Sequence, residues 1–225
     1  MSAFQHLPSL WQSSALLAAG AGMTIAVSLA GNALGLLIAV PVCLLRLARG
    51  RGARAAGSAY VSFFRGVPLL VQLLVVYYFL PALGLDLPPF VAAAIGLAVC
   101  TAAYQAENLR GGFLIIPAGQ IDAARAFGYN GLQRQRYILI PQALRAAAPT
   151  VINEMILILK ASSLVSVVGV ADLMRVSQNI VARELDPIRW YTAAALIYLV
   201  INLVLALLGR AAERRLNAGY ARGTL

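Results

Sequence analysis

The stretch DAARAFGYNGLQRQRYILIP, from Asp122 to Pro141, is polar and helix-forming within a chain that is otherwise strongly apolar. The alanine-rich residues 121–127 favour a helix. Gly128 can adopt the left-handed conformation that commonly ends a helix, and Asn130-Gly131 is a strong turn dipeptide. We therefore predict two short helices joined by a turn, the second over about 132–140, with Pro141 near the start of a membrane span.

The composition around this stretch is that of an integral membrane protein. Of the 225 residues, 61% are hydrophobic and only 12% are charged, whereas soluble domains are about a quarter charged. The net charge of +10 then indicates membrane topology and not nucleic-acid binding, because little soluble surface remains to bind nucleic acid. Residues 1–45 carry no Lys, Arg, Asp or Glu, so we predict a retained membrane helix and not a signal peptide, which needs a basic start.

Several apolar stretches are long enough to cross a bilayer, which takes about 20 residues. The predicted spans cover about 14–45, 66–81, 89–109, 146–164 and 190–209. The first is longer than a bilayer requires, so we expect it to tilt or protrude. The predicted fold class is an all-α integral membrane protein of about five transmembrane helices, with its termini on opposite sides.

The arginines fix the orientation, because cytoplasmic loops collect Lys and Arg. Three segments are strongly basic: the connector after the first span, the connector after the third span, and the C-terminal tail. The connector 81–88 carries only Asp86, and the connector before the last span balances its arginines with acids. We predict an external N-terminal tail (1–13), a transmembrane domain (14–215) whose loop 120–141 is cytoplasmic, and a cytoplasmic C-terminal tail (216–225).

Periodicity alone leaves two interpretations of the 120–141 loop open. It fits an amphipathic segment lying on lipid headgroups, and it fits equally a docking helix for a soluble partner. The spacing, however, resembles the signature loop of ABC importer membrane subunits, which is Glu-Ala-Ala, three residues, Gly, nine residues, then Ile-x-Leu-Pro. Here the matching residues are Asp122-Ala123-Ala124, Gly128 and Ile138-Leu139-Ile140-Pro141. The departures are Asp for Glu at 122 and Ile for Leu at 140.

The resemblance extends beyond the loop. The stretches 63–78, 103–128 and 140–173 are similar to the polar amino-acid branch of these permeases, and so is Gly20-x-x-x-Thr24 followed by Ser28. The resemblance implies the type I ABC importer transmembrane fold in a multi-pass protein of the bacterial inner membrane. It also implies three partners: a second permease subunit (the same chain or a homologue), a cytoplasmic ATPase dimer that holds ATP and Mg, and a periplasmic amino-acid-binding protein.

In such an importer the loop is a coupling helix that fits a groove on the ATPase. The residues carried over by the resemblance are Asp122, Ala123, Ala124, Phe127, Gly128, Tyr129 and Pro141. The small alanine side chains keep the helix narrow, and Gly128 allows a sharp turn. Phe127 and Tyr129 can anchor the helix because aromatic side chains bury a large area with few rotatable bonds. The chain has no Gly-x-x-x-x-Gly-Lys-Ser/Thr phosphate loop. We therefore expect a transport subunit that is not itself an enzyme and binds no cofactor.

Polar residues in the fourth span are candidates for the solute pathway. They are Asn153, Glu154, Lys160, Ser162 and Ser163. The first two lie about 12 Å along the helix from Arg145, close to the bilayer midplane. Such groups face a cavity or a partner, so internal pairing and solute contact both remain open. Glu154 and Lys160 are six residues apart and point to different faces. Family members often have an acid after the lysine, and Ala161 here argues weakly against a basic amino acid as the solute.

Other features receive structural interpretations. Glu107 and Arg110 are expected to pair at a hinge beside Gly111-Gly112, and Arg65 to mark a helix entry at the interface. Cys43 and Cys100 show no metal or disulfide spacing. The function predicted is the permease subunit of an ATP-driven importer of an amino acid or a related small solute. The alternative is an ion-gradient-driven carrier or channel, although the sequence shows no inverted repeat. A membrane-embedded enzyme would need a catalytic cluster, and the only histidine is His6.

Overall fold

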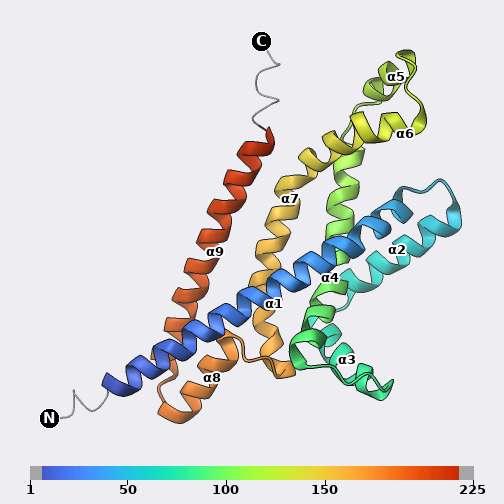
Figure 1. The fold of residues 1–225 in the computed structure, drawn as a ribbon. Coiled ribbons are helices and arrows are strands. Elements are labelled where there is room, and N and C mark those ends of the chain that lie inside the picture. The colour runs from blue at the N-terminus through green and yellow to red at the C-terminus, as the bar shows by residue number, and fades with distance from the viewer. Residues whose placement is uncertain (1–6, 218–225) are drawn as a thin grey trace.

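The computed structural model describes residues 7–217, all of whose regular elements are helical (Figure 1). The elements are α1 (Leu7–Leu47), α2 (Arg51–Gly66), α3 (Leu69–Ala82), α4 (Pro89–Leu114), α5 (Ala118–Ala126), α6 (Gly131–Arg134), η1 (Gln135–Leu139), α7 (Ile140–Ala161), η2 (Ser162–Val168), α8 (Leu173–Glu184) and α9 (Pro187–Asn217). Residues 1–6 and 218–225 of the predicted tails, including His6, lie outside the described residues. The predicted tail boundary at residue 13 falls inside α1.

Four helical stretches in the described part of the chain are long and apolar enough to span a membrane, and a fifth span results if α2 and α3 count as one bent pair. This confirms the predicted class. The connector predicted between the first two spans is wrong in detail, because residues 51–65 form α2. The pair bends by 104° at Pro68, which has no N–H and drives the preceding Val67 to an extended ψ of 132°.

The fourth span also differs from the prediction. Residues 131–168 form one continuous helical stretch of 38 residues, so the expected separate helix at 132–140 and the later span start at 146 are both wrong. A π-helical turn, η1, precedes Pro141 in the first turn of α7. Because proline lacks the N–H that would complete the α-helical ladder, a locally wider turn lets the helix continue through this point.

A second unpredicted helix, α8, replaces most of the connector before the last span. Its N-cap is Asp172, which is fully buried and whose carboxylate accepts hydrogen bonds from the backbone N–H groups of Met174 (3.2 Å) and Arg175 (3.0 Å). Burial raises the pKa of Asp172 above its ordinary value, and these two donors oppose that rise. The capping fixes where α8 begins.

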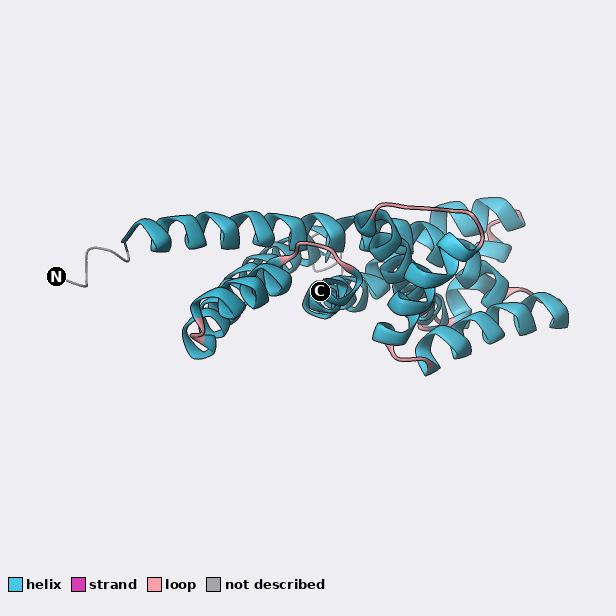
Figure 2. Ribbon diagram, turned by 90° about the horizontal axis from the view of Figure 1, so that it is seen from below, coloured by secondary structure: helices cyan, strands magenta, loops and turns pink. Residues whose placement is uncertain are grey.

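Helix α1 runs diagonally to α7 and α9 and extends to one side of the other helices (Figures 1 and 2). Every fourth residue along one stripe of α1 is small or polar and meets another segment. Gly20 lies against the Leu173 backbone, where an added Cβ would come within 3.0 Å of Cα. The Thr24 hydroxyl accepts from the Leu173 N–H (3.1 Å), and the Ser28 hydroxyl donates to that of Ser162 (2.9 Å). Asn32 donates to the Met155 carbonyl (3.4 Å).

A neighbouring stripe of α1 packs against α4, the most deeply buried helix. A Cβ added at Gly31 would lie 2.7 Å from Leu97, and a Cβ added at Gly35 would lie 2.8 Å from Thr101. Small residues let two helices approach closely, which matters in lipid because apolar burial alone does not favour helix association there. The two stripes make α1 the element against which α4, α7 and α8 are placed.

The ends of the helices sort into two groups (Figure 1). The α1–α2 connector, the α5–α6 loop and the last turn of α9 lie toward one end, and the start of α1, the α3–α4 connector and α8 lie toward the other. The two predicted basic connectors and the last turn of α9, which carries Arg214 and Arg215, therefore share one end, which is the arrangement that the positive-inside rule assigns to the cytoplasm.

The closest approach of α4 and α7 gives a test of this packing. A Cβ at Gly112 would lie 2.3 Å from the Ala143 carbonyl oxygen, whereas a Cβ at Gly111 would meet nothing within 4 Å. We expect Gly112→Ala to destabilise the protein by about 1–3 kcal/mol through overpacking and to lower the thermal unfolding midpoint in detergent. Gly111→Ala is the matched control and should unfold like the parent. Equal midpoints for both variants would contradict the packing described here.

Candidate functional site

The α5–α6 loop is shaped by one glycine. Helix α5 ends at Ala126, and Gly128 has φ +76°. The N–H of Tyr129 donates to the Ala124 carbonyl (3.0 Å), and the N–H of Gly128 donates to the Arg125 carbonyl (2.9 Å). This pair of bonds is a Schellman C-cap, whose left-handed residue is usually glycine. The predicted helix end at Gly128 is confirmed.

The second half of the loop is held by a capping box. The Asn130 side chain accepts from the Gln133 N–H (2.9 Å), and the Gln133 side chain accepts from the Asn130 N–H (2.9 Å). Such reciprocal bonds satisfy two of the free donors at a helix start. The turn between α5 and α6 is therefore fixed on one side by backbone–backbone bonds and on the other by the side chains of Asn130 and Gln133.

An aromatic side chain projects from this rigid turn. Phe127 is 83% exposed, and Tyr129 beside it is partly exposed. With Gln120, Ala123 and Ala124 they border a surface hollow of about 390 Å³. Asp122 and Arg125 form an exposed ion pair (3.0 Å), which contributes little stability in water. The predicted loop residues 122–129 are thus brought together at one surface, while Pro141 lies in the first turn of α7.

The predicted polar residues of α7 separate onto different faces. Asn153 and Lys160 are exposed on one stripe, and Glu154 is half-buried on another. Ser162 is fully buried, with its hydroxyl bonded to Ser28 and to the Leu159 carbonyl. Ser163 is half-buried and donates to the Lys160 carbonyl (3.0 Å). Helical geometry predicted the separation of Glu154 and Lys160, and their different exposure agrees with it.

Glu154 lies near Arg65, and the sequence did not predict that these two residues are neighbours. The Arg65 guanidinium stands 5.1 Å from the centre of the Tyr104 ring, a cation–π contact, and its charge acts on Glu154. Arg65 lies in the last turn of α2, immediately before the bend into α3, so the predicted helix entry at Arg65 is wrong. Within the described side chains, those of Glu154 and Lys160 form no hydrogen bond or ion pair. The only available signal for Arg65 was its place beside Gly66 and Pro68.

Glu107 connects three helices, α1, α2 and α4. It accepts from Arg46 (2.8 Å) and from Arg110 (2.7 Å), and Arg46 also donates to Ser58 of α2. The predicted Glu107–Arg110 pair is confirmed. The expected hinge is wrong, because α4 continues through Gly111 and Gly112 to Leu114. The ion pairs therefore fasten helix ends and leave no polar group for solute.

The opposite end of the molecule carries an apolar projection that the sequence analysis did not identify. Leu185, in the turn between α8 and α9, is 83% exposed, and Ile188, in the first turn of α9, is 82% exposed. Leu185 is the one described non-glycine residue with positive φ (55°). Its neighbour Glu184 accepts from Ser13 (3.2 Å) and from the Trp190 ring N–H (2.9 Å), so the turn is held against the start of α1.

Neither cysteine forms a metal or disulfide site. Cys43 and Cys100 are both buried, and neither is in a disulfide. Across the described residues, no group of three or more His, Cys, Asp or Glu side chains could hold a metal ion.

Comparison with known sequences gives consistent matches over nearly the whole chain. The profile of the family described as "Binding-protein-dependent transport system inner membrane component" matches residues 31–218. The L-cystine transport system permease protein TcyB of Bacillus subtilis (strain 168) is 36% identical over 92% of this chain and 89% of its own length. The glutamine permease GlnP of Escherichia coli (strain K12) is 36% identical over 93% and 96%. The arginine permease ArtQ of Bacillus subtilis (strain 168) is 34% identical over 88% and 91%.

Solved structures match as well. An amino acid ABC transporter crystallised with histidines superposes with a TM-score of 0.85 at 34% identity, covering 92% of this chain and 97% of that one. The MetNI methionine ABC transporter, in an inward-facing form, superposes with a TM-score of 0.79 at 23% identity over 96% and 99%. The second likeness concerns the fold alone.

The two exposed surfaces can be assigned to opposite sides of the membrane. We expect a membrane-impermeant maleimide to label Ile188→Cys in right-side-out vesicles and to leave Phe127→Cys unlabelled, because these side chains lie at opposite ends of the helices. Inside-out vesicles should give the reverse pattern. Background labelling should be low, since both native cysteines are buried. Labelling of both variants from the outside would contradict the assigned orientation.

Proposed function

The chain belongs to the family of binding-protein-dependent transport system inner membrane components, and we propose that it passes an amino acid across the bacterial inner membrane along the exposed face of α7. It is the membrane-spanning permease subunit of an ABC importer. It is not an enzyme, since the ATPase of such an importer is a separate subunit, and a binding protein supplies the solute.

The charged side chains along α7 are complementary to the two charged groups of an amino acid. Relatives are named for cystine, glutamine and arginine, all of which carry an ammonium and a carboxylate. Lys160, on the exposed stripe, offers a partner for the second. Glu154 offers one for the first from the adjacent half-buried face, about 9 Å away along the helix and about 120° around its axis. The observation that carries this proposal is that both charges lie at membrane depth without a hydrogen-bonded partner in the described chain. Asn153 and Ser163 border the same route.

Ser162 has a different role in this proposal. Its hydroxyl is inside the helix bundle and holds η2 to α1. We therefore keep Ser162 among the residues that position the pathway. A second permease subunit, either the same chain or a homologue, would close the pathway on the side that α7 leaves open.

The α5–α6 loop is the proposed contact with the ATPase. Phe127 projects from a turn that backbone bonds hold rigid, and rigid aromatic anchors are what protein interfaces favour. Pro141 begins the stiff helix behind the loop, so movement of the loop is passed to α7. The binding protein would meet the opposite end, where Leu185 and Ile188 are exposed, and its docking should protect Ile188→Cys from maleimide.

Replacing Gly128 tests the coupling role. A β-branched residue with φ near +76° is strained by about 1–2 kcal/mol or more, so Gly128→Val should redirect Phe127. We expect ATP-dependent uptake in reconstituted vesicles to fall at least about tenfold, with loss of ATPase stimulation by loaded binding protein. Gly131→Ala is the control, because a Cβ there meets nothing within 4 Å. Normal uptake by a Gly128→Val complex that copurifies with its ATPase would refute the docking role.

Neutralising the α7 charges tests the pathway. Loss of one charge-assisted contact weakens binding by about 1.5–3 kcal/mol, so Glu154→Gln and Lys160→Gln should each reduce uptake roughly tenfold or more. Docking of the binding protein, measured by copurification, should be unchanged. Glu213→Gln, at the cytoplasmic end of α9, is the matched control. Parent-level uptake by both pathway variants would mean that these groups pair within the assembly. Uptake without ATP, driven by an ion gradient, would favour a carrier instead.

A further inference from the structure

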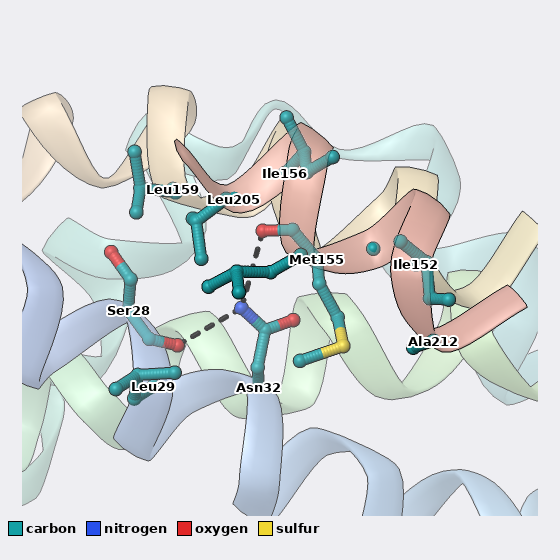
Figure 3. A pocket seen from close by; sticks show the side chains of 11 residues that line it. Ser28, Leu29, Asn32, Ile152, Met155, Ile156, Leu159, Leu205 and Ala212 are labelled. Carbon is teal, nitrogen blue, oxygen red and sulfur yellow. Dashed lines mark hydrogen bonds between the residues drawn. The ribbon is translucent and has the colours of Figure 1, made fainter. Parts of the chain in front are cut away.

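A cavity lies against a face of α7 about 100° around the helix axis from the exposed stripe of Asn153 and Lys160, and Figure 3 shows residues that line it. It has a volume of about 290 Å³ and is walled by α1, α7 and α9. On α7 the cavity is lined by Ile152, Met155, Ile156 and Leu159. Asn153 and Lys160 lie on a different, exposed stripe of the same helix. The cavity is therefore separate from the solute route and is not used by the transport mechanism proposed above.

The floor of this cavity is preformed. Asn32 points into it from α1 and donates to the carbonyls of Ser28 (3.0 Å) and Met155 (3.4 Å), which ties α1 to α7 (Figure 3). Its Oδ1 is buried and has no hydrogen-bond partner among the described residues. Because protein atoms cover this oxygen, the surface that the cavity presents is almost entirely hydrocarbon. At the cytoplasmic side α9 closes onto α7, where a Cβ at Gly209 would lie 2.5 Å from Ile152.

The mouth of the cavity opens toward the surroundings. Leu29 and Leu208 line it and are 51% and 62% exposed. Helix α9 is the least enclosed of the spanning helices, with 11% of its apolar window buried within the chain. An apolar mouth at this depth meets acyl chains, since the hydrocarbon core of a bilayer is about 30 Å thick.

Basic residues on α9 lie about as far from the cavity as a lipid headgroup lies from the end of its acyl chain. Arg210, Arg214 and Arg215 are exposed on the last turns of α9, and Arg214 lies about 14 Å along the helix from the cavity residue Leu205. That is close to half the thickness of the hydrocarbon core. Basic residues near the cytoplasmic surface attract anionic headgroups, with a contribution of about 1 kcal/mol each. Only Glu213 opposes them within this segment.

We propose that the cavity between α1, α7 and α9 is a binding site for an anionic phospholipid of the cytoplasmic leaflet. One acyl chain fills the cavity between Met155 and Leu205, and Arg214 and Arg215 hold the headgroup. The lipid completes the packing of α9, which the rest of the chain leaves largely bare. This site does not depend on which solute is transported.

Photo-crosslinking tests the site directly. The importer complex would be reconstituted in phosphatidylcholine vesicles that contain a phosphatidylglycerol with a diazirine near the end of one acyl chain. After illumination, peptide mass spectrometry should place the label on Met155, Leu205 or Leu208. Unlabelled phosphatidylglycerol should compete at these positions, and phosphatidylcholine should not. Equal competition by the two lipids would refute recognition of the anionic headgroup.

Variants test the binding of the headgroup and the binding of the acyl chain separately. Arg214→Gln with Arg215→Gln should weaken competition by phosphatidylglycerol on the order of 20-fold, and Leu205→Phe should reduce labelling by filling the cavity. Arg49→Gln with Arg51→Gln removes the same charge at the same side of the membrane and should leave labelling unchanged, as should Leu199→Phe. Absence of label at the cavity, together with a disulfide between two copies carrying Leu208→Cys, would overturn the proposal and assign the cavity to a subunit interface.

Discussion

The four-residue ladder Gly20, Thr24, Ser28 and Asn32 on α1 is the constraint on which the rest of the structure depends. In a bilayer, apolar burial does not favour one helix contact over lipid, so close approach and interhelical hydrogen bonds decide which helices associate. Gly20 and Thr24 supply such contacts to the start of α8, Ser28 to η2, and Asn32 to the middle of α7. Together they fix the position and rotation of α7. The exposed stripe of Asn153 and Lys160 faces away from α1 as a consequence.

That placement lets one long rod connect the two surfaces of the molecule. The helical stretch from Gly131 to Val168 begins at the capping box behind Phe127 and ends beside the buried N-cap of α8. Its α-helical part, α7, has 22 residues and is about 33 Å long at 1.5 Å per residue, close to the thickness of the hydrocarbon core. A displacement of the loop is passed along this helical stretch. It must appear as movement of α7 and η2, or as bending at the π-helical turn before Pro141.

The sequence predicts the parts of this arrangement that depend on composition and local spacing. The span predicted at about 89–109, observed as α4 (Pro89–Leu114), follows from apolar length, and the end of α5 follows from Gly128, because one residue type suits a left-handed position. Helices α2 and α8 were missed because each mixes polar and apolar residues, so neither stands out in a search for apolar stretches. Asn32 and Arg65 were missed for another reason. Their roles depend on partners far along the chain, such as Met155, 123 residues from Asn32, and no local pattern encodes such pairs.

The packing around α7 explains why positions on different faces of this helix have different roles. Residues 152, 155, 156 and 159 face α1 and α9, and residues 153, 157 and 160 are exposed about 100° away around the helix axis. A rotation of α7 that changes the solute face therefore also changes its contact with α9. That contact is narrow, since its closest point is Ile152 against Gly209. Whatever occupies the bare side of α9 thus contributes to the energy of rotating α7, and the membrane environment becomes part of the transport equilibrium.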